Sequence, residues 1–159
     1  MSPLVSRGRS AYAPQGSRGS SDHNISRPVA LILGVTYLFA GVVGFAVTGF
    51  GGFVASNGSK FLGFPLNGFH NVVHIGIGAI LIVASRLPDA TVTQGILLGV
   101  GVLYTAAVLL GFLGKLPIIA VVSAGNPDNF LHLFSALVAI FGGLAGAAEQ
   151  RDSDAAFGG

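Results

Sequence analysis

The chain has 159 residues, of which 52% are hydrophobic and only 9% are charged. Soluble domains carry about a quarter charged residues, so this composition excludes an ordinary soluble domain and indicates a membrane protein. The sequence has no cysteine, which excludes disulfides, thiolate metal sites and cysteine nucleophiles. The net charge is +2, and four of the eight basic residues lie in the first 27 positions. A basic segment next to a membrane span favours contact with anionic lipid over nucleic acid.

Residues 1–27 are rich in Ser, Gly and Arg and hold too little apolar surface to offset the entropy of ordering the chain. We therefore expect a disordered basic tail. Four apolar stretches follow, each of roughly the ~20 residues that cross a bilayer as a helix. They predict transmembrane helices at about 28–50, 66–86, 91–113 and 127–148, within a domain at 28–148. Residues 149–159 are expected to form a short polar C-terminal tail.

The first and third apolar stretches share one pattern, and the second and fourth share another. Gly34-x-x-Tyr37 with Gly44 returns as Gly101-x-x-Tyr104 with Gly111, and Asn71-x-x-His74 returns as Asn129-x-x-His132. Such repetition indicates one two-helix hairpin used twice. The predicted fold class is all-α: an integral membrane four-helix bundle built from two repeated helical hairpins, with a pseudo-twofold axis along the membrane normal.

Small residues at helical spacing mark the faces along which the predicted helices should pack. In lipid, helices associate through close packing, which small residues permit. We expect these faces to turn towards the bundle or towards a partner, either another membrane protein or a second copy in a homo-oligomer. They carry Gly34, Tyr37, Gly41, Gly44, Gly101, Tyr104, Gly111 and Gly143.

Each hairpin has one longer loop between its two helices. The loop at 49–67 contains a Phe-Leu-Gly-Phe stretch that we expect to lie in the membrane interface. The loop at 116–125 is apolar, but about ten residues are too few to span the bilayer as a helix. We expect a re-entrant or interfacial segment there.

The distribution of basic residues predicts the orientation. Four Arg lie in the N-terminal tail, Arg86 lies in the turn after the second helix, and Arg151 lies near the C-terminus, whereas Lys60 and Lys115 each stand alone in a loop. The positive-inside rule then places both termini in the cytoplasm and both Asn-x-x-His motifs towards the outer face. We expect a multi-pass protein of the plasma membrane.

Polar side chains within the spans are the candidates for function, because lipid makes them costly. In one interpretation His74 and His132 are structural and hydrogen-bond to the neighbouring asparagines, to a backbone carbonyl or to each other. In another, His74 and His132 bind a haem through both axial positions. Further alternatives are a zinc or copper site formed by His70 and His74 with His132 or Asp128, a quinone or small-lipid pocket, and a proton relay. The candidate cluster is Asn71, His74, Asn129, His132, His70 and Asp128.

The two tyrosines lie on the small-residue faces of the first and third predicted helices. Because helical side chains lean towards the N-terminus of their own helix, we expect Tyr37 and His74 to lean apart and not to meet directly. The tyrosines are then predicted to be packing residues that hydrogen-bond to a neighbouring helix.

The sequence contains no Ser-His-Asp arrangement with an acid at depth, no phosphate-binding loop and no dinucleotide fingerprint. These absences favour a non-enzymatic role, as a structural or accessory membrane subunit. The alternatives are a small haem-, metal- or quinone-binding membrane protein that uses His74 and His132, and a transporter of a small neutral or lipid-like solute.

The Gly34-x-x-Tyr37, Gly44-Phe45, His70-Asn71-x-x-His74 and Asn129-x-x-His132 patterns together resemble a bacterial four-helix membrane family known only as a domain of unknown function. The resemblance covers about residues 28–148. It implies four membrane spans and carries no activity, cofactor or catalytic residue to this chain.

Overall fold

The computed structural model describes residues 24–57 and 59–157. Its long helices are α1 (Ser26–Thr48), α2 (Gly68–Ser85), α3 (Ala90–Phe112) and α4 (Asp128–Phe157). All four are long and apolar enough to cross a membrane, which confirms the predicted all-α four-helix fold and the multi-pass character of the protein. The expected disordered tail at 1–27 lies almost entirely outside the described residues.

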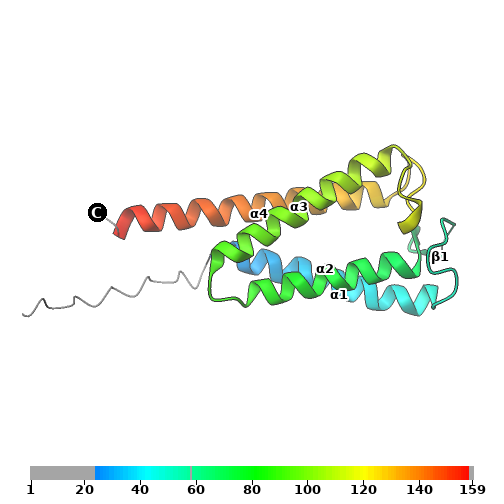
Figure 1. Cartoon of the computed structure of the whole chain (residues 1–159), viewed down its shortest axis with the longest axis horizontal. Coiled ribbons are helices and arrows are strands. Elements are labelled where there is room, and N and C mark those ends of the chain that lie inside the picture. The colour runs from blue at the N-terminus through cyan, green and yellow to red at the C-terminus, as the bar shows by residue number, and fades with distance from the viewer. Residues whose placement is uncertain (1–23, 58, 158–159) are drawn as a thin grey trace, which may run out of the picture.

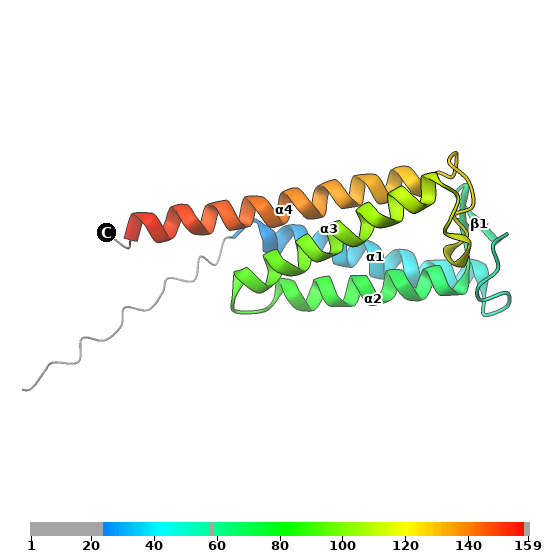
Figure 2. The same cartoon turned by 45° about the horizontal axis from the view of Figure 1, so that its top comes forward.

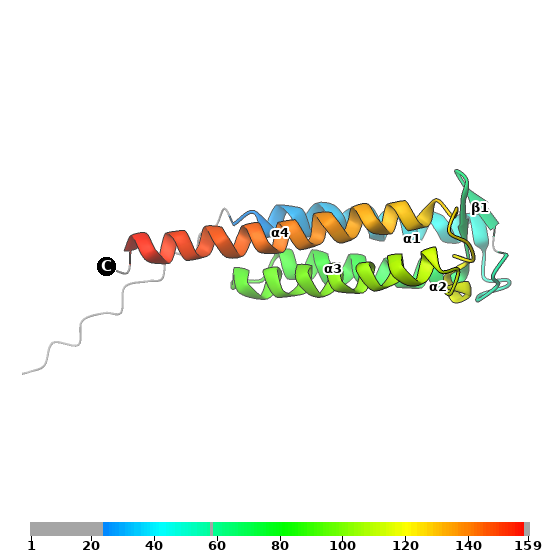
Figure 3. The same ribbon diagram turned by 90° about the horizontal axis from the view of Figure 1, so that it is seen from above.

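The bundle consists of two layers, each of them one hairpin. α1 and α2 form one layer and α3 and α4 the other (Figure 1), and each helix packs mainly on its hairpin partner. An oblique view shows both long loops meeting at one end of the bundle, close to β1 (Figure 2). Seen from above, α4 runs along α1 and α3 runs along α2 (Figure 3). The two hairpins therefore meet along two seams, one between α1 and α4 and one between α2 and α3.

Glycines bring the two helices of each hairpin into close contact. A Cβ atom on Gly34 would lie 2.9 Å from the carbonyl oxygen of Gly78, and one on Gly78 would lie 2.5 Å from the backbone nitrogen of Leu38. In the second hairpin a Cβ on Gly101 would lie 2.5 Å from Cγ1 of Ile140. The glycine faces predicted from the sequence thus turn into the bundle and are filled by the chain itself.

The loop between α1 and α2 folds into a small antiparallel hairpin of β1 (Ser59–Phe61) and β2 (Phe64–Leu66). Its two turn residues, Leu62 and Gly63, have φ angles of 52° and 90°, as a type I′ turn requires. The sequence pattern predicts that this Phe-Leu-Gly-Phe stretch lies at the membrane interface, and it predicts no strands there. Asn or Asp usually precedes Gly in such turns, so Leu62 gave no hairpin signal.

The loop between α3 and α4 folds back over the end of the bundle. It contains a short 3-10 helix, η1 (Pro117–Ile119), followed by Ala120 and Val121, both 0% exposed. The amide nitrogen of Asn67 donates to the carbonyl oxygens of Ala55 at 3.0 Å and Ile118 at 2.9 Å. One side chain at the start of α2 therefore fastens both loops over the bundle end.

α4 continues to Phe157, so residues 149–157 are helical where the sequence analysis expected a tail. Polarity does not by itself stop a helix outside lipid, and Ala, Glu, Gln and Arg in this segment are good helix formers. The extension also has partners. The backbone N–H of Ile25 donates to Glu149 Oε2 at 2.9 Å, and Gln94 Nε2 donates to Gln150 Oε1 at 2.9 Å.

The close approach of α1 and α2 predicts different effects at two glycines of one helix. Gly78→Ala should lower the free energy of unfolding by about 1–3 kcal/mol, because the new methyl group overlaps the backbone of α1. Gly76→Ala meets nothing within 4 Å and should be neutral or stabilising by up to about 1 kcal/mol. Thermal unfolding in mild detergent measures both, and equal stabilities would contradict this packing.

Candidate functional site

The candidate site lies at the loop end of the bundle, where α2 and α4 begin. His70 and His74 lie one turn apart on α2, and His132 lies on the first turns of α4. Their exposed fractions are 1%, 5% and 2%. The helix starts are fixed by asparagine caps, since Asn67 Oδ1 accepts from the backbone N–H of His70 at 2.9 Å and Asn126 Oδ1 accepts from that of Asp128 at 3.0 Å.

The three imidazole rings face one another. One ring nitrogen from each lies within 4.8 Å of those of the other two. The ring centres of His70 and His74 are 4.4 Å apart, and those of His70 and His132 are 5.9 Å apart. The three histidines therefore form one buried cluster that is close enough to hold a metal ion.

Asp128 completes this group from the opposite hairpin. Its Oδ2 lies 3.9 Å from Nδ1 of His70, which is too long for a hydrogen bond, and both side chains are 1% exposed. The two residues hold equivalent positions of the repeat, each directly before the asparagine of an Asn-x-x-His motif. The pseudo-twofold arrangement thus places a histidine of one copy opposite the aspartate of the other.

Most of the buried nitrogens in the cluster have no partner. Both ring nitrogens of His70, Nε2 of His74 and Nδ1 of His132 are buried without a hydrogen bond in the part of the chain that the structure describes. The Oδ2 atom of Asp128 is also buried without a hydrogen bond among the described residues. The hydrogen bonds that a purely structural role of His74 and His132 would require are not found among the described residues.

The two motif asparagines hydrogen-bond within their own hairpins and not to the histidines. Asn71 packs against Gly44, and its Nδ2 donates to Thr48 Oγ1 at 2.9 Å. Asn129 packs against Gly111 in the same manner, and its Nδ2 donates to the carbonyl oxygens of Ser123 at 3.0 Å and Ala124 at 3.1 Å. Each asparagine therefore holds the end of the preceding helix or loop in place.

The expectation that Tyr37 and His74 do not meet is wrong. Their ring centres are 5.2 Å apart, and the equivalent Tyr104 and His132 rings are 5.3 Å apart. In the antiparallel pair, Gly34 lies level with Gly78 and Gly41 with Asn71, so Tyr37 and His74 start from nearly the same depth. The opposite lean of the two side chains is too small to separate rings of this size.

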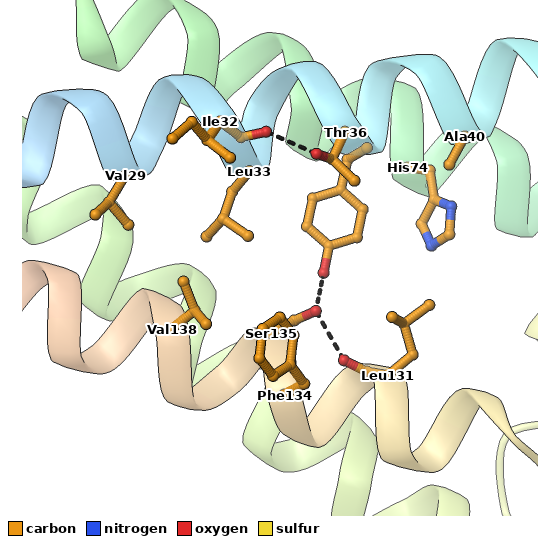
Figure 4. A pocket seen from close by; sticks show the side chains of 11 residues that line it. Val29, Ile32, Leu33, Thr36, Ala40, His74, Leu131, Phe134, Ser135 and Val138 are labelled. Atoms are coloured by element: carbon orange, nitrogen blue, oxygen red, sulfur yellow. Dashed lines mark hydrogen bonds between the residues drawn. The ribbon is translucent and has the colours of Figure 1, made fainter.

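The tyrosines also join the two hairpins. The rings of Tyr37 and Tyr104 stack at 5.3 Å with an angle of 16° between their planes. Tyr37 donates a hydrogen bond to Ser135 Oγ on α4, and Ser135 donates in turn to the carbonyl oxygen of Leu131 at 2.8 Å (Figure 4). Sequence reasoning did not identify Ser135, although its position three residues after His132 places it on the same helix face.

Tyr104 differs from its repeat equivalent in having no partner for its buried hydroxyl among the described residues. The position that corresponds to Ser135 is Ile77 in α2. The hydrogen bond from a tyrosine to a serine of the other hairpin is therefore made on one side of the axis only.

A cavity of about 160 Å³ lies beside the cluster along the seam between α2 and α3. All three histidines line it, together with Tyr104 and with Leu116 and Ile119 of the folded-back loop. The cavity has room for a small ligand next to the histidines and is smaller than a haem. Haem binding, which the sequence analysis also considered, stays a prediction.

A family model described as a domain of unknown function (DUF4383) matches residues 27–145 of the chain. No curated protein and no solved structure matches the chain. The matched region runs from the first turn of α1 into α4 and includes every member of the cluster.

The two motif asparagines predict separate, local effects when they are replaced. Asn129→Ala should loosen the loop at 116–125, because two backbone carbonyls lose their donor. The unsatisfied groups should lower the stability of the loop by about 1–3 kcal/mol. Hydrogen exchange of that loop should rise. Asn71→Ala is the matched control and should loosen the end of α1 while leaving the 116–125 loop protected. Equal exchange of that loop in both variants would contradict the assignment.

Proposed function

The chain belongs to the DUF4383 family of domains of unknown function, and on this premise we propose that it is a multi-pass membrane protein that binds a divalent transition-metal ion through His70, His74 and His132. The observation that carries the proposal is the set of buried, unpartnered ring nitrogens within 4.8 Å of one another. A buried polar group without a partner costs about 1–3 kcal/mol, and one ion would satisfy three such groups together.

The spacing of the ligand atoms fits this role with a modest adjustment. Ligands about 2.1 Å from a tetrahedral ion lie about 3.4 Å apart. The nitrogens are within 4.8 Å of one another, so small rotations of the side chains would close the site. His70 and His74 come from adjacent turns of α2, and His132 comes from α4 of the other hairpin.

The donor set selects a class of metal. Imidazole nitrogen suits Zn, Cu, Fe and Ni ions, whereas the sequence has no cysteine thiolate to favour softer ions. Asp128 supplies the acid next to His70 that commonly orients a ligating histidine. Its carboxylate would also offset part of the ion's positive charge within the bundle.

The three histidines would leave one position of a tetrahedral ion open. The cavity of about 160 Å³ lies on that side of the cluster, lined by the same three residues. Three histidine ligands with one open position are typical of sites where the fourth ligand exchanges, whereas structural zinc sites use four protein ligands. We therefore propose a site that also accepts a small exchangeable ligand.

The role of a structural subunit that associates through its glycine faces has less support. Gly34, Gly78 and Gly101 pack within the chain's own hairpins, so they are not available to a partner. The histidine cluster, in contrast, has unused bonding capacity.

Metal binding can be measured on the purified protein after removal of bound ions with a chelator. Reloading with Co²⁺ or Zn²⁺ should give about one ion per chain by elemental analysis, with the visible absorption of a nitrogen-coordinated cobalt. Replacing the acid beside a ligating histidine typically costs ~10–100-fold in affinity, so Asp128→Asn should weaken binding by that factor. His132→Ala removes a ligand and should weaken binding by more than ~100-fold. His23→Ala, which replaces the one histidine of the sequence that the proposal does not use, is the matched control.

A second readout separates lost binding from lost folding. An ion at 100 times its dissociation constant stabilises the folded state by about 2.7 kcal/mol, so zinc should raise the melting temperature of the unaltered protein and of His23→Ala. His132→Asn, which is closer in size to histidine than alanine, should fold without this gain. A folded, unaltered protein that takes up no ion would overturn the proposal.

We also propose that both termini are cytoplasmic and that the cluster lies towards the outer face, as the distribution of basic residues indicates. Because the sequence has no cysteine, single cysteines at Ser59 and Asp152, both exposed, test this orientation. A membrane-impermeant maleimide should label Ser59→Cys in intact cells, and Asp152→Cys only after permeabilisation. The reverse pattern would invert the orientation.

A further inference from the structure

A second pocket lies on the other seam of the bundle, between α1 and α4, and holds about 290 Å³ (Figure 4). Its rim is formed by Ile32 and Phe134, whose exposed fractions are 67% and 62%. Both residues belong to helices that cross the membrane, so this rim faces hydrocarbon. A lipid-soluble molecule could therefore enter the pocket sideways from the bilayer.

The inner wall of this pocket is apolar over most of its surface and carries a few polar side chains. Tyr37 and Ser135 form a hydrogen-bonded pair there, and Ser135 donates a hydrogen bond in turn to the carbonyl oxygen of Leu131. His74 lines the same wall, is 5% exposed and has a buried Nε2 without a partner among the described residues. Figure 4 shows its ring lying between α1 and α4. Tyr37 is the central residue of α1, so the pocket lies along the membrane-spanning part of that helix.

The repeat shows that the hydroxyl groups of this pocket are not needed for folding. The cavity on the α2–α3 seam is its counterpart, since Tyr104, Ala107 and His132 there correspond to Tyr37, Ala40 and His74 here. At two positions a hydroxyl-bearing residue of one seam is matched by an aliphatic residue of the other: Thr36 and Ser135 on the α1–α4 side correspond to Leu103 and Ile77. The same fold therefore packs these positions with aliphatic residues, and the hydroxyl-bearing seam has the larger pocket.

We propose that the α1–α4 pocket binds the head group of a neutral, ring-bearing lipid with carbonyl or hydroxyl groups, of the quinone type. An apolar cavity of about 150 Å³ holds benzene, so 290 Å³ accommodates a substituted ring with the start of a tail. Among the described residues, no Lys, Arg, Asp or Glu lines the pocket, which favours an uncharged ligand. A phospholipid acyl chain would leave the buried Nε2 of His74 without a polar partner.

The ligand's carbonyl oxygen would accept from the N–H of the His74 ring nitrogen that does not bind the metal ion, or its hydroxyl would donate to Ser135 Oγ, while Phe134 packs on the ring. The tail would leave past Ile32 into the bilayer. This proposal does not rest on the metal site, because Ser135 and Thr36 take no part in the histidine cluster. His74 is the one residue that the two sites share.

The test uses the full chain in lipid nanodiscs and a short-chain benzoquinone that carries a photoreactive azide. After illumination, the label should be found by peptide mass spectrometry on α1 between residues 29 and 40 and on α4 between residues 131 and 138. Ser135→Ile, which installs the residue of the equivalent position, should reduce labelling at least tenfold. Thr36→Leu should reduce it by a smaller factor.

The matched controls are the reverse exchanges on the other seam, Ile77→Ser and Leu103→Thr, which should leave labelling unchanged. Melting temperature and zinc content are measured in parallel and should be retained in Ser135→Ile, so that a loss of quinone binding is distinct from unfolding and from failure of the metal site. Labelling spread over both seams, labelling unaffected by Ser135→Ile, or displacement by phospholipid alone would each overturn the proposal.

Discussion

The contact of backbone on backbone within each hairpin is the constraint on which the rest of this structure depends. Gly34 and Gly78 bring the backbones of α1 and α2 into contact, and Gly143 brings α4 against the backbone of α3 at Gln94. This approach fixes the antiparallel register of each pair. The register in turn brings Tyr37 level with His74 and Tyr104 level with His132. The buried cluster is therefore a consequence of the positions of glycines such as Gly78, which lies one turn after His74.

The sequence predicted the features that depend on periodicity and failed for those that depend on three-dimensional register. Four apolar stretches and two repeated motifs were sufficient for the four-helix fold, because span length and helix faces are local properties. The contact between Tyr37 and His74 was missed, since it requires knowing which residues of two antiparallel helices lie at one depth. Ser135 was missed because its importance comes only from Tyr37, 98 residues away. The apolar character of the 116–125 loop had a clear cause that the sequence could not show: the loop closes over the cluster.

The two halves of the molecule share a backbone plan and differ in their chemistry. Gly44 with Asn71 and Gly111 with Asn129 make the same contact in both halves, and these are scaffold positions. The differences are concentrated at the axis and along the seams, where His70 faces Asp128 and where Ser135 replaces the aliphatic residue of the other copy. Some positions between the hairpins have thus diverged between the two copies, whereas the stacked Tyr37 and Tyr104 have not. The diverged positions are where function is expected in a duplicated fold.

The pairing of His70 with Asp128 has a consequence for the way such a bundle can be assembled. In a symmetric homodimer of one hairpin, a residue at the twofold axis faces only its own copy, so a histidine would meet a histidine and an aspartate would meet an aspartate. Two carboxylates at that distance in a lipid environment would repel each other. Covalent linkage of the hairpins through the short turn between Ser85 and Ala90 removes this restriction. A single chain can therefore place a base opposite an acid on the axis, which no exact dimer of its halves could do.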